Sequence, residues 1–207
     1  MIRFNGFDLS KWSSSHWAKG ATALVLAASM TAVFIGDADA QRSRRDRPSE
    51  EEQAENAVER VFSARIGEIV LEAQTMQGEG LFSESIATLN RALAESSINP
   101  YERSISLQMR GRGYYEMENV QQAITDWNAA IATGAMLPSE IVSMRMNIGQ
   151  LYITEGQYAQ GIDIFQLAIR EGGPEVLTPR LAKMLAQAYA QAERYREGLE
   201  YAEIAYA

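Results

Sequence analysis

The chain has 207 residues, 46% of them hydrophobic, which suits one domain with a buried core. Its net charge of −8 argues against a general nucleic-acid-binding protein, because the phosphates of DNA or RNA require a basic surface. Cysteine is absent and His16 is the only histidine, which excludes disulfides, thiol nucleophiles and Cys-ligated zinc. A mature chain that lacks His16 also lacks the commonest general base and metal ligand. We therefore expect no enzyme activity, no cofactor and no metal site.

Residues 1–40 have the three-part pattern of a secretory signal. A basic N-terminal segment precedes an uncharged stretch, residues 21–35, and Ala38 and Ala40 are the small residues that signal peptidase requires. The uncharged stretch is short for a membrane span, which needs about 20 residues. We expect cleavage after Ala40, and therefore an exported, periplasmic protein of bacterial type.

An uncleaved membrane anchor over residues 20–36 is the alternative. The charged segment before it is long, and four arginines follow the expected cleavage position, at 42, 44, 45 and 47. Arginines at that place oppose export, because positive charge tends to stay on the cytoplasmic side. In this alternative the protein is anchored in the inner membrane by that segment and contacts the membrane nowhere else.

A charged linker follows at residues 41–55. It has almost no apolar side chains, so we expect a disordered tether between the export signal and a helical domain over residues 56–207. From Ala54 the apolar residues are spaced by three and four, which is typical of a helix. This helix either covers the first repeat or continues into that repeat's first helix.

A sequence repeat organises the remaining chain. Its four copies, in register, begin at residues 80, 118, 156 and 193, so the steps are 38, 38 and 37 residues. A regular step of this size is typical of stacked helical hairpins. We expect about four repeats, over residues 66–103, 104–141, 142–178 and 179–207.

Each repeat contains two amphipathic helices. The first helix of the second repeat is expected over Ser104–Met117, after a helix stop at Asn99-Pro100, with Gly111 as the small residue on its apolar face. The second helices carry a small residue one turn from their start, such as Gly161 and Gly198. Since glycine inside a helix costs about 1 kcal/mol relative to alanine, these two glycines indicate close contact between helices.

These columns resemble the tetratricopeptide repeat (TPR) family. The resemblance rests on Gly111 with Tyr114, on Gly149 with Tyr152, and on the series Tyr158, Gly161, Phe165 and Ala168. It covers the chain from about Ile66 to the C-terminus, although the unit is longer than the family's usual ~34 residues. The first repeat lacks the Gly/Tyr pair, and the fourth has Ala202 where a large aromatic residue is usual. The resemblance implies an all-α fold, a right-handed α-solenoid of stacked helix-turn-helix repeats.

The resemblance also implies a concave groove lined by the first helices. Projected onto this chain, the candidate groove includes Val70 and ten candidate peptide-binding residues: Gln74, Gln77, Gln108, Arg112, Tyr115, Met146, Gln150, Ile153, Lys183 and Gln187. Amide side chains can hydrogen-bond the backbone of an extended peptide, while aromatic and aliphatic residues accept its apolar side chains. The alternative is that these are ordinary polar surface residues of a spacer.

Two other features have structural explanations. Trp127 falls at an apolar column of its helix, so we expect it in the core. Asp126 and Asp163 recur on consecutive second helices and are expected on their outer, solvated sides, which argues against a shared active site.

The C-terminal end lacks a polar capping helix over Leu199, Ile204 and Tyr206, although solenoids usually need one to stay soluble. Three explanations are open: a fragment of a longer protein with more repeats, which we favour, self-association through the uncapped end, or docking onto a partner.

The sequence predicts a non-catalytic scaffold or adaptor of the cell envelope that binds a peptide or protein segment in the groove. The alternatives are a structural component of an envelope assembly that uses its outer face or open end, and a regulatory repeat domain of a longer protein.

Overall fold

The computed structural model describes residues 60–206, so the predicted signal or anchor in residues 1–40 and the linker 41–55 lie outside the described residues. The chain divides into two units, residues 1–51 and 52–207, and the described residues belong to the second. Helices alone form the regular structure of this part, as predicted, and none of them is long and apolar enough to cross a membrane.

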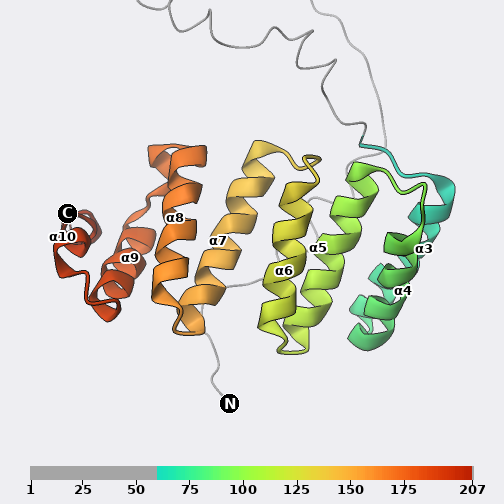
Figure 1. Cartoon of the computed structure of the whole chain (residues 1–207), viewed down its shortest axis with the longest axis horizontal. Coiled ribbons are helices and arrows are strands. Elements are labelled where there is room, and N and C mark those ends of the chain that lie inside the picture. The colour runs from blue at the N-terminus through green and yellow to red at the C-terminus, as the bar shows by residue number, and fades with distance from the viewer. Residues whose placement is uncertain (1–59, 207) are drawn as a thin grey trace, which may run out of the picture. The chain divides into compact units, whose positions relative to one another are not determined.

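Eight α-helices form four antiparallel hairpins in the described part of the chain. Figure 1 shows the hairpins following one another in chain order, so each packs on its neighbours in sequence. A short 3-10 helix, η1 (Pro174–Val176), lies between the third and fourth hairpins. The hairpins are α3 (Ala64–Gly78) with α4 (Phe82–Ala94), α5 (Pro100–Glu116) with α6 (Val120–Ala132), α7 (Pro138–Thr154) with α8 (Tyr158–Gly172), and α9 (Pro179–Gln191) with α10 (Tyr195–Tyr206).

Prolines begin three of the four described first helices rather than ending the helices before them. α5 begins at Pro100, so the expected start at Ser104 was wrong by one turn. Asn99 Oδ1 accepts a hydrogen bond from Glu102 N, and Glu102 Oε2 accepts one from Asn99 N, both at 2.9 Å. Proline is favoured at the first helical position, where its missing N–H leaves no bond unmade. Pro138 and Pro179 likewise occupy the first positions of α7 and α9.

Glu102 also joins α5 to the residues before α3. Its Oε1 accepts hydrogen bonds from the backbone N and the Oγ of Ser63, both at 2.6 Å. Burial opposes ionisation of this carboxyl, but the hydrogen bonds from Ser63 and Asn99 outweigh it and lower the pKa of Glu102. The carboxylate therefore fixes the first hairpin to the start of the second.

The segment before α3 reaches a third hairpin. Arg60 donates to both carboxylate oxygens of Glu140 near the start of α7, at 2.7 and 3.1 Å. Between them, Asn99 Nδ2 donates to the Val61 carbonyl at 3.1 Å. Residues 60–63 therefore cross the N-terminal ends of three first helices and tie them together.

Close contact at small residues closes the hairpins, as the glycines at 161 and 198 predicted. A Cβ atom added at Gly111 would lie 2.5 Å from Trp127 Nε1, and one at Gly149 would lie 2.7 Å from Phe165 Cε1. On the other side of the contact, a Cβ at Gly161 would lie 2.5 Å from Ile153 Cδ1. Real Cβ atoms do not approach other atoms so closely, and the aromatic rings therefore fill the space that these glycines leave.

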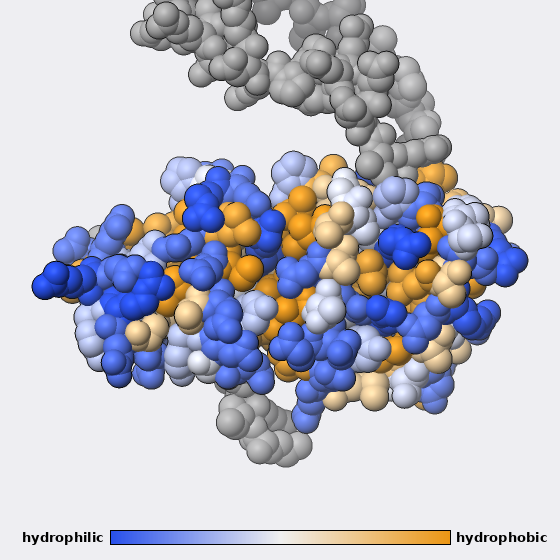
Figure 2. All heavy atoms as spheres, in the orientation of Figure 1, coloured by the Kyte–Doolittle hydropathy of each residue, from blue (hydrophilic) through white to orange (hydrophobic). Residues whose placement is uncertain are grey.

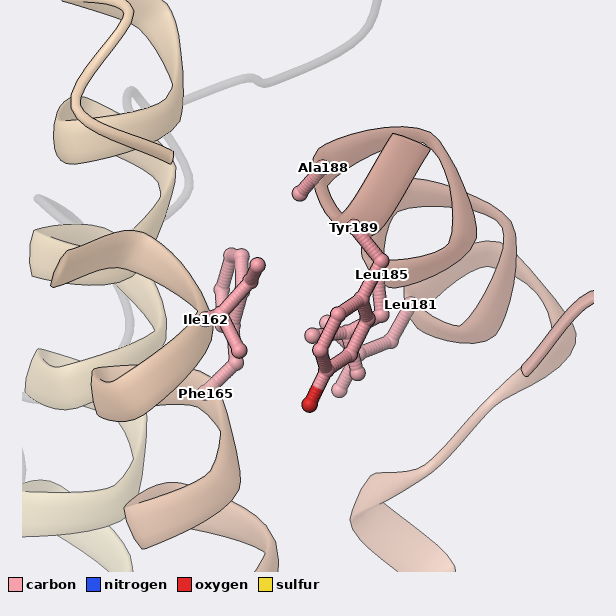
Figure 3. Close-up of a cluster of buried hydrophobic side chains, with 6 residues drawn as sticks. All are labelled: Ile162, Phe165, Leu181, Leu185, Ala188 and Tyr189. Atoms are coloured by element: carbon pink, nitrogen blue, oxygen red, sulfur yellow. The ribbon is translucent and has the colours of Figure 1, made fainter. Parts of the chain in front are cut away.

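Apolar side chains also fill the junctions between hairpins. At the last junction, Ile162 and Phe165 of α8 face Leu181 and Leu185 of α9 (Figure 3), and all four are at most 2% exposed. Trp127 is buried, as predicted. The core is therefore a series of layers within and between hairpins.

One position in the turn inside each hairpin adopts a left-handed backbone. Gly80 and Gly156 hold it with φ of 77° and 74°, whereas the second and fourth copies place Glu118 and Glu193 there, with φ of 61° and 59°. A non-glycine residue in this conformation costs roughly 1–2 kcal/mol. Two of the four turns are therefore strained.

We predict that Glu118→Gly stabilises the protein by about 0.5–1 kcal/mol, since relief of the strain exceeds the added unfolded-state entropy of glycine. Urea unfolding measures the change. Glu118→Gln is the matched control, because it removes the charge, keeps the strained backbone and should leave the free energy of unfolding nearly unchanged. Equal effects of the two substitutions would contradict the strain explanation.

Candidate peptide-binding surface

A column of polar side chains runs across the four first helices. Gln74, Arg112, Gln150 and Gln187 occupy equivalent positions on α3, α5, α7 and α9, and we call them the polar column. Each follows directly the small residue that contacts the second helix, so each side chain is turned by about 100° from that contact. Gln74 and Gln187 are exposed, and Arg112 and Gln150 are half-buried. The repeat therefore places one long hydrogen-bonding side chain per hairpin along one side of the stack.

The polar column makes only weak contacts within the domain. Arg112 Nε lies 3.9 Å from Glu116 Oε1, one turn away on the same helix. Gln150 Nε2 donates to Thr154 Oγ1 at 3.4 Å, close to the limit for a hydrogen bond. Exposed contacts of this kind are worth roughly 0.5 kcal/mol. A ligand could replace them at little cost, and each glutamine amide can both donate to and accept from a peptide backbone.

Three partly apolar candidates lie beside this column. The Tyr115 ring is 6.2 Å from the Trp127 ring of α6. Met146 and Ile153 of α7 pack against the buried cluster of the last two hairpins. All three are half-buried, so each is anchored in the core and offers only part of its surface to a ligand. Figure 2 shows one face of the domain, on which apolar side chains reach the surface around α6 and α7.

Two candidate residues are buried rather than on the surface. Gln77 is 7% exposed, and its Nε2 donates to the Met109 carbonyl of α5 at 2.7 Å. Gln108 is 6% exposed, and its Nε2 donates to Ser104 Oγ at 3.2 Å. Their amides satisfy polar groups at the contacts between helices, so they do not line an open surface. Val70 is buried as well, while Lys183 is exposed.

An ion pair of a half-buried arginine and a buried aspartate lies at the junction of α4, α5 and α6. Arg110 donates from Nε and Nη2 to the two carboxylate oxygens of Asp126, at 2.7 and 2.6 Å, and from Nη1 to Asn90 Oδ1 at 2.6 Å. Asp126 is 3% exposed, so its expected place on the solvated side of α6 was wrong, whereas Asp163 is exposed as predicted. The hydrogen bonds to Asp126 raise the pKa of Arg110 further above its ordinary value.

The sequence does contain a signal for this pair. In the third repeat, Ile148 of the first helix is equivalent to Arg110. Ile164 of the second helix is equivalent to Asp126. Both positions are apolar in the third repeat and carry opposite charges in the second. A simultaneous exchange of this kind indicates that two residues face each other, and it places the pair between helices rather than in solvent.

No metal centre accompanies these charges in the part of the chain that the structure describes, where no three Asp, Glu, His or Cys residues converge. A shallow hollow between α3 and α4 is lined by charged residues, but Arg65 and Arg91 there pair with Glu95 at 2.5 Å and Glu72 at 3.6 Å.

The hairpins and their glycine contacts define a right-handed α-solenoid of stacked TPR-like repeats, which confirms the predicted fold class. Two crystal structures of MamA share this fold with a TM-score of 0.52 each. One is 15% identical, with 84% of this chain and 94% of that chain covered, and the other is 16% identical, with 68% and 70% covered.

A putative kinesin light chain of Podosopora anserina with nearly identical TPR-like repeats is 18% identical over 67% of this chain and 72% of its own, with a TM-score of 0.49. No family model and no curated protein matches the chain. The likeness to the MamA structures supports the fold alone, and the ligand has to be inferred from the surface.

We predict that Asp126→Ile alone destabilises the protein by about 2 kcal/mol, because it leaves the half-buried Arg110 without its carboxylate partner. The double substitution Arg110→Ile with Asp126→Ile should recover most of that loss, since it reproduces the apolar pair that the third repeat carries at 148 and 164. Urea unfolding of the two variants tests this. A double variant no more stable than the single one would show that the pair is not an isolated unit.

Proposed function

We propose that the repeat domain is a non-catalytic protein-interaction scaffold that binds an extended peptide or protein segment along the polar column. The observation that carries this proposal is the recurrence of Gln74, Arg112, Gln150 and Gln187 at one position of four successive first helices. A regular row of hydrogen-bonding groups matches the regular backbone of an extended peptide, which offers a donor and an acceptor at every residue. Tyr115, Met146 and Ile153 add partly exposed apolar surface beside it for the peptide's side chains.

A single cation in the middle of this row suggests the preferred partner. Arg112 is flanked by Gln74 and Gln150 in the neighbouring repeats, and among the described residues its guanidinium group pairs with Glu116 alone, at a distance of 3.9 Å. A ligand carboxylate would bind it by two parallel hydrogen bonds, which is a stronger arrangement. A segment with an acidic residue near its centre therefore fits better than a basic one.

We predict that Arg112→Ala with Gln150→Ala weakens binding of peptides selected from a random library on the full chain by at least about tenfold, the loss of roughly 1.4 kcal/mol. Fluorescence anisotropy measures the affinity. Arg170→Ala with Gln160→Ala is the matched control, because it removes the same residue types from exposed positions of α8. Equal affinities of the two variants would overturn the proposal.

The N-terminal residues support a location in the cell envelope. Residues 1–40 carry the pattern of a secretory signal, and the repeats would then act in the periplasm, or at the inner membrane if residues 20–36 remain as an anchor.

We predict that N-terminal sequencing of the protein purified from the envelope fraction yields a chain that begins at Gln41. An N-terminus at Met1 would instead support the anchor, and recovery in the cytoplasm would contradict both.

A further inference from the structure

The junction between the second and third hairpins is the least extensive of the three in the described part of the chain. The backbones of α6 and α7 approach each other over a shorter stretch than those of α4 and α5 or of α8 and α9. Side-chain hydrogen bonds reinforce the other two junctions. Gln77 donates to the Met109 carbonyl across the first at 2.7 Å, and Gln166 donates to Tyr189 Oη across the third at 2.5 Å. The stack therefore opens with the least loss of packing at its second junction.

The connection at this junction can absorb such a movement. Residues 133–137 join α6 to α7, and Gly134 among them has a left-handed backbone with φ of 71°. A Cβ atom added at Gly134 would meet nothing within 4 Å, whereas Ala135 and Met136 after it are buried. Hinges are a few loop residues that absorb a change in backbone dihedral angles. Gly134 is therefore the point at which this connection can turn.

Residues 60–63, which we call the N-terminal strap, bridge the same junction from outside. At one end, Ser63 is bonded to Glu102 at the start of α5, on the second hairpin. At the other end, Arg60 donates to both carboxylate oxygens of Glu140 near the start of α7, on the third hairpin, at 2.7 and 3.1 Å. The strap thus holds one hairpin on each side of the junction.

The two ends of the strap differ in how readily they are released. Glu102 is 1% exposed, and its contacts with the backbone N and the Oγ of Ser63 are both 2.6 Å long. The side chains of Arg60 and Glu140 are 32% and 38% exposed, so water and salt compete with their contact. An exposed charge pair changes an equilibrium by no more than about fivefold. The Arg60 end is therefore a reversible contact, and the Ser63 end is a fixed one.

The polar column crosses the junction that the strap bridges. Arg112 of α5 and Gln150 of α7 lie on opposite sides of it. A turn at Gly134 would move these two side chains apart, so a peptide that contacts both binds the closed stack more tightly than the open one. By linkage, whatever holds the stack closed raises the affinity for the peptide, and the peptide in turn stabilises the closed stack.

We propose that the N-terminal strap is a latch that holds the second and third hairpins together through Arg60 and Glu140, and that it thereby raises the affinity of the polar column for a peptide. The effect on affinity rests on the proposed peptide-binding function, whereas the latch itself does not.

Distances between spin labels on the full chain, without any peptide, test the latch. The chain contains no cysteine, so two introduced cysteines carry the only labels. Gln122→Cys with Gln160→Cys, at equivalent exposed positions of α6 and α8, reports on the second junction, and Glu84→Cys with Gln122→Cys, on α4 and α6, reports on the first. In electron paramagnetic resonance, Arg60→Gln should broaden the first of these distance distributions and shift it to longer distances. It should leave the second distribution unchanged.

Two further substitutions separate the latch from a general loss of charge. Arg65→Gln is the matched control, because Arg65 pairs at 2.5 Å with Glu95 of its own hairpin, and it should change neither distribution. Arg60→Lys keeps the cation but cannot bind both carboxylate oxygens in parallel, so its distribution should lie between those of the native chain and Arg60→Gln.

Peptide affinity, measured by fluorescence anisotropy with the library-selected peptides, tests the coupling. Arg60→Gln should weaken binding by about threefold, within the range that an exposed charge pair can supply, and Arg65→Gln should leave it unchanged. Arg60 is not a member of the polar column, so a loss of affinity in this variant reflects the hairpins rather than a lost contact with the peptide.

The latch is overturned if Arg60→Gln leaves the distances between residues 122 and 160 as they are, or if Arg65→Gln changes them equally. Longer distances with unaltered peptide affinity would overturn the coupling. Failure of the proposed function is seen separately, as equal affinities of the Arg112→Ala with Gln150→Ala variant and its control. In that case the effect on affinity falls with it, and the distances alone decide the latch.

Discussion

The middle hairpins depend on contacts in which one helix has no side chain and the other fills the space. Gly111 receives the Trp127 ring and Gly149 receives the Phe165 ring, each at a distance that leaves no room for a methyl group. Such a contact fixes the crossing point of the two helices of a hairpin, and it thereby fixes which residues point sideways. The polar column follows directly, because each of its members is the residue next to the contact.

This constraint also explains how binding residues can vary while the fold is kept. The contact uses one position per helix, and the next position is at least partly exposed, so it can hold Gln74, Arg112 or Gln150. Positions one turn away are less free. Gln77 and Gln108 are polar, yet the approach of the neighbouring helix buries them and engages their amides. The exposure of polar side chains therefore changes within three or four residues along a first helix.

The distinction between repeated packing positions and variable surface positions also separates what could be predicted from the sequence from what could not. The hairpins, the close contacts at Gly161 and Gly198 and the burial of Trp127 follow from columns that recur in four copies, and the structure confirms them. The start of α5 did not follow, because Asn99-Pro100 was interpreted as a stop, whereas Asn99 caps the next helix. The binding residues themselves remain predictions, since periodicity identifies a face but does not identify its ligand.

The ion pair of Arg110 and Asp126 shows that comparing equivalent positions of the repeats is informative even where the prediction for a single residue is wrong. Single-helix periodicity put Asp126 in solvent, because a lone aspartate on a helix is usually exposed. Its burial is understandable only with Arg110 sixteen positions earlier, so the relevant unit is the pair of columns rather than either helix alone. The same reasoning applies at the other end of the domain. Leu199 looks like an ordinary surface leucine until it is compared with Ile86, Ile124 and Ile162, which are buried at the equivalent position of the other three second helices.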